Sequence, residues 1–329
     1  MSRQPHVVLA GGTGFLGQIL TEYFLKQGYR IDILSRAPQA SRPGVTYHQW
    51  DGRTAGTWMV TLEGATALIN LSGRSVDCRY TAENKAKIYA SRLESTAILG
   101  EALALCEEAP PLWINLSSAT YYRHAEDRPM TEADGEAGTG FSVDVVKSWE
   151  KTFLEAEVPG IRKVALRTSF VVGPQGSAYP VYRKLAKLGL GGTQGNGQQY
   201  VSWVHYHDFV RMVAWILEHP QAEGVYNASA PDPLRNHLFL KLLRQSLGVK
   251  WGLPATRWMV KMGAWVLRTE AELILKSRQV VPQRFQEEGF TFCYPTWADA
   301  SRQLAQSTPL RQAKVSDANK GTIQPSFFH

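Results

Sequence analysis

The sequence predicts an α/β protein built on a doubly wound parallel sheet. Short apolar runs alternate with longer helical patterns through the first two thirds of the chain, and the first run ends in a glycine-rich turn. Hydrophobic residues make up 44% and charged residues 20% of the 329 residues, values typical of globular proteins. Continuously apolar strands indicate a parallel sheet buried on both faces, and right-handed crossovers place helices on each side.

The predicted elements follow one another with short connections. Strands are expected over residues 6–10, 29–36, 45–50, 65–73, 112–118 and 161–173. The first helix carries apolar residues at helical spacing from Phe15 to Phe24 and is closed by Gly28. Two more helices are expected over residues 81–107 and 141–157.

The composition changes after Pro174, which predicts a second, smaller unit. Glycines accumulate over residues 186–200, and helical segments follow at 236–247 and 256–276, the latter with Trp258 and Trp265 interpreted as core residues. The expected organisation is a nucleotide-binding domain (residues 1–175, completed by about 201–230), a smaller α/β substrate lobe (176–200 and 231–303) and a polar tail (304–329).

Charge and cysteine content exclude several classes of protein. Lys and Arg number 36 against 29 Asp and Glu, but no basic run exceeds two residues, so neither nucleic acid nor a membrane is an expected partner. No stretch of 18 apolar residues occurs, and the N-terminus lacks an apolar leader. Cys78, Cys106 and Cys293 are widely spaced, which predicts free thiols, no metal site and a cytoplasmic protein.

The strongest motif is the loop Gly-Gly-Thr-Gly-Phe-Leu-Gly at residues 11–17. It satisfies G-x-G-x-x-G directly after a strand and at the start of a helix, where the dinucleotide-binding motif belongs. Glycines permit a tight turn and a close approach of the backbone to a diphosphate, which the helix N-terminus stabilises. The loop therefore predicts an NAD(P)-binding Rossmann fold, and the missing Lys-Ser/Thr excludes a P-loop.

The end of the second strand bears on the choice of cofactor. NAD enzymes place an Asp or Glu there to bind the ribose 2′-hydroxyl, whereas this chain has Ser35 and Arg36, which suit a 2′-phosphate. The alternative is NAD, with Asp32 on the ribose. The small-residue turn Leu71-Ser72-Gly73 ends the fourth strand and is interpreted as a passage for the cofactor, although a plain turn explains it equally well.

These residues together resemble the extended short-chain dehydrogenase/reductase superfamily. The similarity is to its atypical "epimerase family" branch, which includes proteins described as cell-division-inhibitor-like and nucleoside-diphosphate-sugar-epimerase-like. It covers nearly all of residues 6–303, and its most distinctive stretches are 188–208 and 280–295. The resemblance implies NADP(H) as cofactor, bound by the following residues: Gly11, Thr13, Gly14, Phe15, Leu16, Gly17, Ser35, Arg36, Leu71, Ser72, Gly73, Arg92, Ser117 and Val171.

The resemblance also implies a chemistry of which only part is present. Hydride-transferring members use a Ser or Thr, and a Tyr and Lys four residues apart on one helix. Ser118, at the end of the fifth strand, matches the first position, but none of the 13 tyrosines has a Lys four residues later. Aligned by Trp149-Glu150, the helix carries Ser142 and Val146 in these places, with Lys147 one residue away.

Other residues are candidates for the missing roles. Tyr122, with Tyr121, follows Ser118 closely and is the candidate proton donor, although a packed aromatic pair is an equally good interpretation. The glycine-rich loop at 189–197, with Gln198 and Gln199, is the candidate for contact with the substrate, against a simple connection between lobes. His205, His207 and Asp208 follow a strand, where a structural role is favoured over metal binding.

Two functional hypotheses follow. The first is an NADP-dependent oxidoreductase or epimerase acting on an unknown small polar or nucleotide-linked substrate. The second is a catalytically inactive NADP(H)-dependent regulator or interaction protein, which the missing Tyr and Lys favour. By analogy with extended members, a homodimer through helices at 83–106 and 141–157 is possible.

Overall fold

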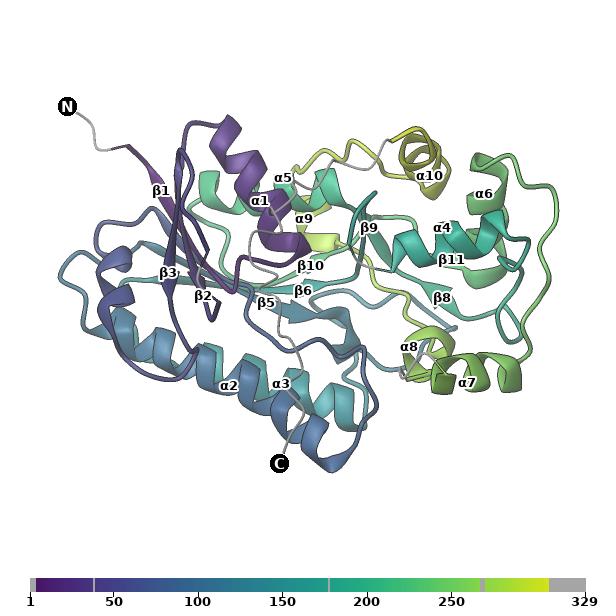
Figure 1. The fold of residues 1–329 in the computed structure, drawn as a ribbon, viewed down its shortest axis with the longest axis horizontal. Coiled ribbons are helices and arrows are strands. Elements are labelled where there is room, and N and C mark those ends of the chain that lie inside the picture. Colours follow the sequence, from purple (N-terminus) through teal and green to yellow (C-terminus); the bar gives the residue numbers. More distant parts are fainter. Residues whose placement is uncertain (1–3, 38, 177, 267–269, 308–329) are drawn as a thin grey trace, which may run out of the picture.

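A seven-stranded parallel sheet forms the centre of the molecule (Figure 1). The computed structural model describes residues 4–37, 39–176, 178–266 and 270–307. Strand order is β10-β6-β5-β4-β1-β2-β3, which reverses direction beside β1, as in the Rossmann fold. The strands are β1 (His6–Ala10), β2 (Arg30–Ser35), β3 (Val45–Gln49), β4 (Ala67–Asn70), β5 (Leu112–Ser118), β6 (Arg162–Thr168) and β10 (Gly224–Ala228). The predicted fold class is confirmed.

Helices cover both faces of this sheet. On one face lie α1 (Phe15–Lys26), α5 (Tyr206–Glu218) and α9 (Gln283–Glu287), and on the other α2 (Ala82–Ala104) and α3 (Phe141–Leu154) (Figure 1). Side chains of β1 alternate between the two cores: Val7 and Leu9 pack on the α1 side, and Val8 on the α2 side. All three are fully buried, which explains why the strand is apolar throughout.

A second apolar core lies beside the sheet, in the part of the chain predicted as the smaller lobe. Trp203, Phe239 and Trp297 are among its largest buried side chains. It is built from two-stranded sheets and helices: β7 (Phe170–Val172) with β9 (Trp203–His205), β8 (Tyr200–Val201) with β11 (Leu234–Arg235), α4 (Tyr179–Lys187), α6 (Asn236–Ser246) and α10 (Trp297–Gln306). The same part of the chain also contains α7 (Arg257–Val266) and α8 (Glu272–Leu275). The exact division into domains remains a prediction.

Several predicted boundaries are wrong. The strand at 161–173 is interrupted at Ser169, because β7 leaves the main sheet to pair with β9. The tail cannot begin at 304, because Leu304 is buried in α10; residues 308–329 lie outside the described residues. The interpretation of Trp258 and Trp265 as core residues is also wrong. They are 62% and 65% exposed, because the opposite side of α7, with Val260 and Ala264, is the buried one.

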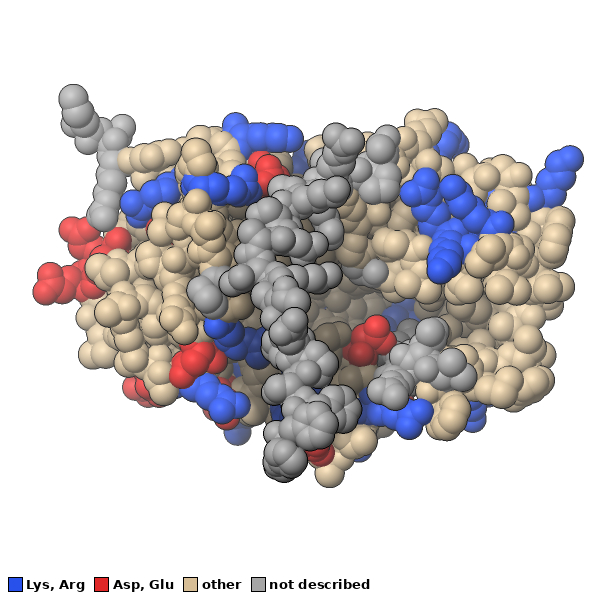
Figure 2. Space-filling model, viewed as in Figure 1, with Lys and Arg blue, Asp and Glu red and all other residues tan. Residues whose placement is uncertain are grey.

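The expectations from composition concern charge, cysteines and membrane spans. Lys and Arg side chains stand at several separate places on the face in Figure 2, with Asp and Glu between them. Cys78, Cys106 and Cys293 are free thiols. Within the described ranges, no helix is both long enough and apolar enough to cross a bilayer. The cytoplasmic location and the absence of nucleic-acid partners remain predictions.

His205, at the end of β9, connects this strand to α10 within the second core. Its ring is 1% exposed, Nε2 lies 3.0 Å from Gln303 Oε1, and Nδ1 accepts a hydrogen bond from the His207 backbone N–H. Burial lowers the pKa of His205 to about 4. The neutral ring is therefore part of the packed structure, which makes its role structural.

Acid is expected to destabilise the protein through His205. In the unfolded chain this histidine has an ordinary pKa of about 6.5, whereas in the folded protein its pKa is about 4. Between these two values only the unfolded chain binds the proton, so the free energy of unfolding falls as the pH is lowered through this interval. Between about pH 7 and pH 5 this group removes about 2 kcal/mol from the free energy of unfolding. Urea unfolding of wild type and His205→Gln at both pH values measures it. An equal pH-dependent loss in both proteins contradicts the prediction.

Candidate cofactor and substrate site

A cavity of about 570 Å³ opens at the carboxyl ends of β1, β4 and β5, against α2 and α3. Parallel sheets bind ligands at this edge. Of the predicted site residues, these line it: Gly11, Gly14, Phe15, Leu16, Gly17, Leu71, Ser72, Gly73, Arg92, Ser117, Ser118 and Val171. The structure therefore brings most of the predicted set together around one space, whereas Thr13, Ser35, Arg36 and Tyr122 do not line it.

The glycine loop closes the β1 end of the cavity. Gly11 has a φ of +74°, and a Cβ there would lie 2.9 Å from Ser72 Oγ. A Cβ on Gly17 would lie 2.1 Å from the carbonyl oxygen of Gly12, so Gly17 lets α1 pack against the turn. A Cβ on Gly14 would meet no protein atom within 4 Å, and α1 begins there without a side-chain cap. The turn and the helix N-terminus can thus receive an anionic group.

Two hydroxyls near the cavity indicate that a ligand fits it. The Oγ atoms of Ser72 and Ser169 are buried, and neither has a hydrogen-bond partner among the described residues. Both residues line the cavity, Ser72 beside Gly11 and Ser169 where β6 ends. Buried polar groups normally have partners, so these two hydroxyls are available for a polar ligand.

The acidic residue of β2, Asp32, does not face the cavity as a ribose-binding acid would. Asp32 is 4% exposed, and its carboxylate lies 2.9 Å from His48 Nε2 and 3.2 Å from Arg30 Nη2. It is thus engaged inside the protein rather than presented to the cavity. Ser35 is buried, and its hydroxyl donates a hydrogen bond to the carbonyl oxygen of Ala37 and accepts one from the Ala37 backbone N–H. The Arg36 side chain is exposed.

Arg92 on α2 supplies a cation to the cavity wall. Its guanidinium lies 5.1 Å from the centre of the Trp149 ring, and Nη1 donates to the carbonyl oxygens of Arg74 and Ile88. Burial lowers the pKa of Arg92 to about 10, so the side chain stays charged at neutral pH. Since no Asp or Glu is among the described residues that line the cavity, its charge is available to an anionic ligand.

The structure places Ser118 and Tyr122 in different surroundings. Ser118 lines the cavity, where its hydroxyl donates to Thr120 Oγ1 and accepts from the Thr120 backbone N–H. Tyr122 is fully buried, and its hydroxyl donates to Asn227 Oδ1 (2.8 Å) and accepts from Arg167 Nη1 (3.0 Å). The interpretation of Tyr122 as the candidate proton donor is corrected: the 3-10 turn between the two residues directs its ring into the interior, where it packs edge-on against Tyr121.

A buried ion pair lies behind this wall of the cavity. Arg167 on β6 donates to both carboxylate oxygens of Glu150 on α3, each at 2.8 Å, and both side chains are less than 10% exposed. Ser117 donates its hydroxyl to the same carboxylate. The Ser117 side chain is therefore committed to the protein interior, although the residue borders the cavity.

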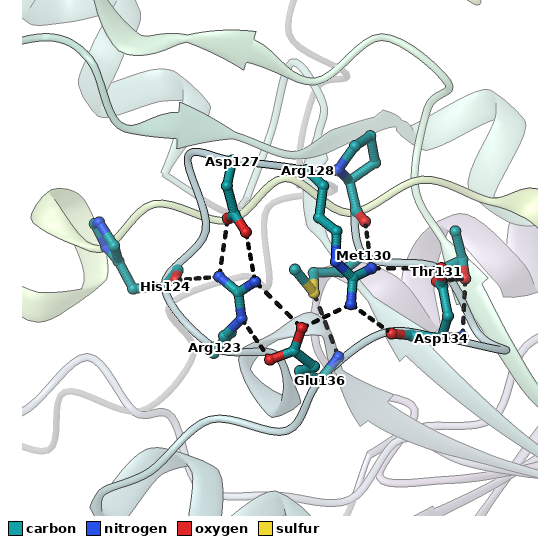
Figure 3. A network of polar contacts seen from close by, with 9 residues as sticks. Arg123, His124, Asp127, Arg128, Met130, Thr131, Asp134 and Glu136 are labelled. Carbon is teal, nitrogen blue, oxygen red and sulfur yellow. Dashed lines mark hydrogen bonds and ion pairs between the residues drawn. The ribbon is translucent and has the colours of Figure 1, made fainter.

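The loop from Arg123 to Glu136 joins this region to α3 and is held by exposed ion pairs. Figure 3 shows Arg123 between Asp127 and Glu136, and Arg128 between Glu136 and Asp134. Hydrogen bonds from Arg123 hold the pKa of the Asp127 carboxyl below its usual range. These contacts fix the loop that covers Tyr122, so they organise the site without taking part in it.

Two other candidate segments lie away from the cavity. The glycine-rich loop at 189–197 pairs with the segment before α7, where Gly192 N–H donates to Leu253 O, and Gln199 is 2% exposed. It is a packed connection, which corrects the expectation of substrate contact. His207, Asp208 and Cys293 gather within 4.8 Å, but Arg211 donates to both Asp208 and Cys293, so a cation already occupies the place of a metal ion.

Sequence reasoning missed part of the cavity wall. Tyr80, before α2, lines the cavity, and its hydroxyl lies 3.4 Å from the Ser142 hydroxyl on α3. Arg74 and Thr168 line it as well. The turn at Leu71-Ser72-Gly73 was the available signal, because the chain that follows a strand at this edge continues along the ligand site.

Comparisons with known proteins agree with this geometry. The model of the NAD dependent epimerase/dehydratase family matches residues 7–229. The chain belongs to this family. A model of a domain of unknown function, DUF1731, matches residues 255–304.

Relatives within the epimerase/dehydratase family span nearly the whole chain. The epimerase family protein YfhF of Bacillus subtilis is 30% identical over 300 residues, 91% of this chain and 97% of that protein. The human epimerase family protein SDR39U1 is 28% identical over 303 residues, 91% of this chain and 99% of that protein. The crystal structure of its isoform 2 with NADPH superposes with a TM-score of 0.83 at 26% identity, covering 92% of this chain and 100% of that one.

Helix α3 lacks the Tyr and Lys that the resemblance implies for hydride-transferring epimerase/dehydratase proteins. Ser142 and Val146 both border the cavity, in the places aligned with that pair. Lys147 is exposed, and its Nζ donates to the carbonyl oxygen of Gly138 rather than reaching the cavity. No lysine of the described residues lines the cavity, so the usual Tyr and Lys pair has no counterpart there.

Proposed function

We propose that this protein is an NADP(H)-dependent oxidoreductase or epimerase that acts on a small polar or nucleotide-linked substrate. The observation that carries the proposal is the cavity over the glycine loop, in which the unpartnered Ser72 hydroxyl faces Gly11. The NADPH in the crystal structure of human SDR39U1 supports the choice of cofactor. NADPH, when bound, supplies a hydride for the reduction of a carbonyl group.

Each part of the site has a role in this proposal. The backbone of residues 11–16 and the N-terminus of α1 bind the diphosphate, with Ser72 as a further donor. Arg36 and Arg92 bind phosphate or ribose groups. Ser118 orients the substrate oxygen with its hydroxyl, at the end of β5. The cavity of about 570 Å³ lies within the usual range for small-molecule sites.

Arg36→Ala is expected to weaken NADPH binding about 10- to 150-fold and to leave NADH binding unchanged. A charged hydrogen bond to the 2′-phosphate contributes about 1.5–3 kcal/mol, and NADH lacks that phosphate. Calorimetric titration of nucleotide-free protein measures both affinities. Arg42→Ala is the matched control, because Arg42 is an exposed arginine paired with Glu22. An unchanged ratio of NADPH to NADH affinity in Arg36→Ala overturns the assignment of Arg36.

The loss of the Tyr and Lys from α3 favours one alternative, an inactive NADP(H)-dependent regulator. A panel of aldehydes, ketones and nucleotide sugars, followed by loss of the reduced nicotinamide absorbance, separates the two functions. Consumption of NADPH supports the enzyme. Tight NADPH binding without consumption, together with a protein partner whose binding depends on the redox state of the nucleotide, supports the regulator. We further propose that the protein is a homodimer and is located in the cytoplasm.

A further inference from the structure

We propose that Tyr80 is the proton donor of this site and replaces the tyrosine that α3 lacks. The inference rests on the proposed function and deepens it. Tyr80 precedes α2, on the wall of the cavity that faces α3, and its hydroxyl lies 3.4 Å from Ser142 Oγ. Ser142 stands where the resemblance puts the missing tyrosine. The Tyr80 phenol, which comes from the segment before α2, thus lies next to the short side chain of Ser142 on α3.

The composition of the cavity wall leaves few alternatives. Among the described residues that line it, Tyr80, Arg74 and Arg92 are the titratable side chains. An arginine keeps its proton at all ordinary pH values and is a poor acid. Serine and threonine hydroxyls ionise with greater difficulty than a phenol, and that of Ser117 already donates to a protein group. Tyr80 is therefore the Brønsted acid best suited to give up a proton here.

Tyr80 is held in place from several sides. Its backbone N–H donates to Glu270 Oε1 (2.9 Å), and its ring packs edge-on against Phe141, with centroids 4.8 Å apart. The preceding Arg79 donates to the carbonyl oxygen of Trp265 and lies over its ring. The following Thr81 caps α2 through Asn84 N–H. A catalytic group needs this kind of support to keep its geometry.

The surroundings keep the phenol protonated until it is used. Burial raises the pKa of Tyr80, and the hydrogen bond with Ser142 opposes the rise. Charged and titratable groups face it from several elements: Glu270, Glu272 and Cys78 raise this pKa further, and Arg92 and Arg278 also lie within electrostatic range. A neutral phenol beside a hydroxyl that can stabilise its anion is the state a proton donor requires.

The proton transfer balances as follows. The carbonyl carbon of the substrate receives a hydride, with its electron pair, from the reduced nicotinamide, which is oxidised while the carbonyl is reduced. The O–H bond of Tyr80 breaks, its proton forms a new O–H bond on the substrate oxygen, and the electron pair stays on the phenolate. The Ser142 hydroxyl donates a hydrogen bond to the phenolate until solvent returns a proton.

Two measurements on the full-length protein test the assignment, with Tyr80→Phe against the matched control Tyr89→Phe. Tyr89 also packs on Phe141, at 5.7 Å, but does not line the cavity. NADPH consumption is expected to fall about 100-fold or more in Tyr80→Phe, with NADPH affinity unchanged, since proton transfer contributes about 10²–10⁴ in rate. Tyr89→Phe is expected to retain the wild-type rate.

The second measurement requires no substrate. Ultraviolet titration of the tyrosines is expected to show one phenol that ionises at lower pH in the NADP⁺ complex than in the NADPH complex, because the oxidised ring carries a positive charge. The difference should vanish in Tyr80→Phe and persist in Tyr89→Phe. Its persistence in Tyr80→Phe, or a wild-type rate in that variant, overturns the assignment. If the wild type binds NADPH but turns over no substrate, the proposed enzyme and the role of Tyr80 as its proton donor both fail. The titration then shows only whether the Tyr80 phenol lies close to the nicotinamide.

Discussion

Gly17→Ala is expected to destabilise the fold and to weaken NADPH binding together. The new Cβ would lie 2.1 Å from Gly12 O and 2.4 Å from Gly12 C, and both are backbone atoms that cannot rotate away. The turn has to shift, so the N-terminus of α1 moves from the position proposed to bind the diphosphate. We expect a loss of about 1–3 kcal/mol in the free energy of unfolding and at least about a tenfold loss of NADPH affinity.

Two other glycines separate these effects. A Cβ on Gly14 meets no protein atom but projects at the cavity, so Gly14→Ala should lower NADPH affinity at unchanged stability. Gly263, in α7, is also open and remote from the loop, so Gly263→Ala should change neither quantity for the worse. Denaturant unfolding and calorimetric titration measure both quantities in each variant. Wild-type stability and affinity in Gly17→Ala would exclude the close contact described here.

Arg167→Met is expected to cost about 3–5 kcal/mol of folding stability, because it leaves the buried carboxylate of Glu150 without its ion-pair partner. Tyr122 also loses a donor to its hydroxyl. The double variant Arg167→Met/Glu150→Met removes both charges and should recover most of the loss. Urea unfolding of the single and double variants measures the coupling.

An exposed ion pair provides the comparison. Arg53→Ala removes the partner of Glu94 at the surface, where both side chains are more than 40% exposed, and should change stability by less than about 1 kcal/mol. If Arg167→Met behaves like Arg53→Ala, the pair beneath the cavity is not an essential part of the fold. A loss in Arg167→Met that the double variant does not recover would point to packing rather than charge.

Local sequence was sufficient to predict the sheet and the glycine loop. Strand alternation and the loop at residues 11–17 depend on neighbouring residues, and the backbone conformation at Gly11 follows from its position after a strand. Arg92 and Ser118 were located by the resemblance, and both line the cavity. The same approach misplaced Tyr122, because a single 3-10 turn after Ser118 decides which way the ring faces.

The position of Tyr80 on the cavity wall could not be predicted from local sequence. Its place depends on Glu270, which is 190 residues further along the chain, and on Phe141 of a helix that packs against α2. Neither contact leaves a periodic pattern in the sequence. The prediction that Trp258 and Trp265 are core residues was wrong for a related reason. Helical spacing shows that residues share a side of the helix, but tertiary contacts, here those of Val260 and Ala264, determine which side is buried.

The position of β10 at the edge of the sheet has a consequence for synthesis on the ribosome. β10 pairs with β6 through Val164 and Gly224, which are separated by the whole of α4, β8, β9 and α5. At about 5–20 residues per second, the edge of β6 stays open for roughly 3–12 s after it has emerged. An open strand edge can pair with other chains, so a nascent chain is most vulnerable to aggregation in this interval, before the last strand of the seven-stranded sheet exists.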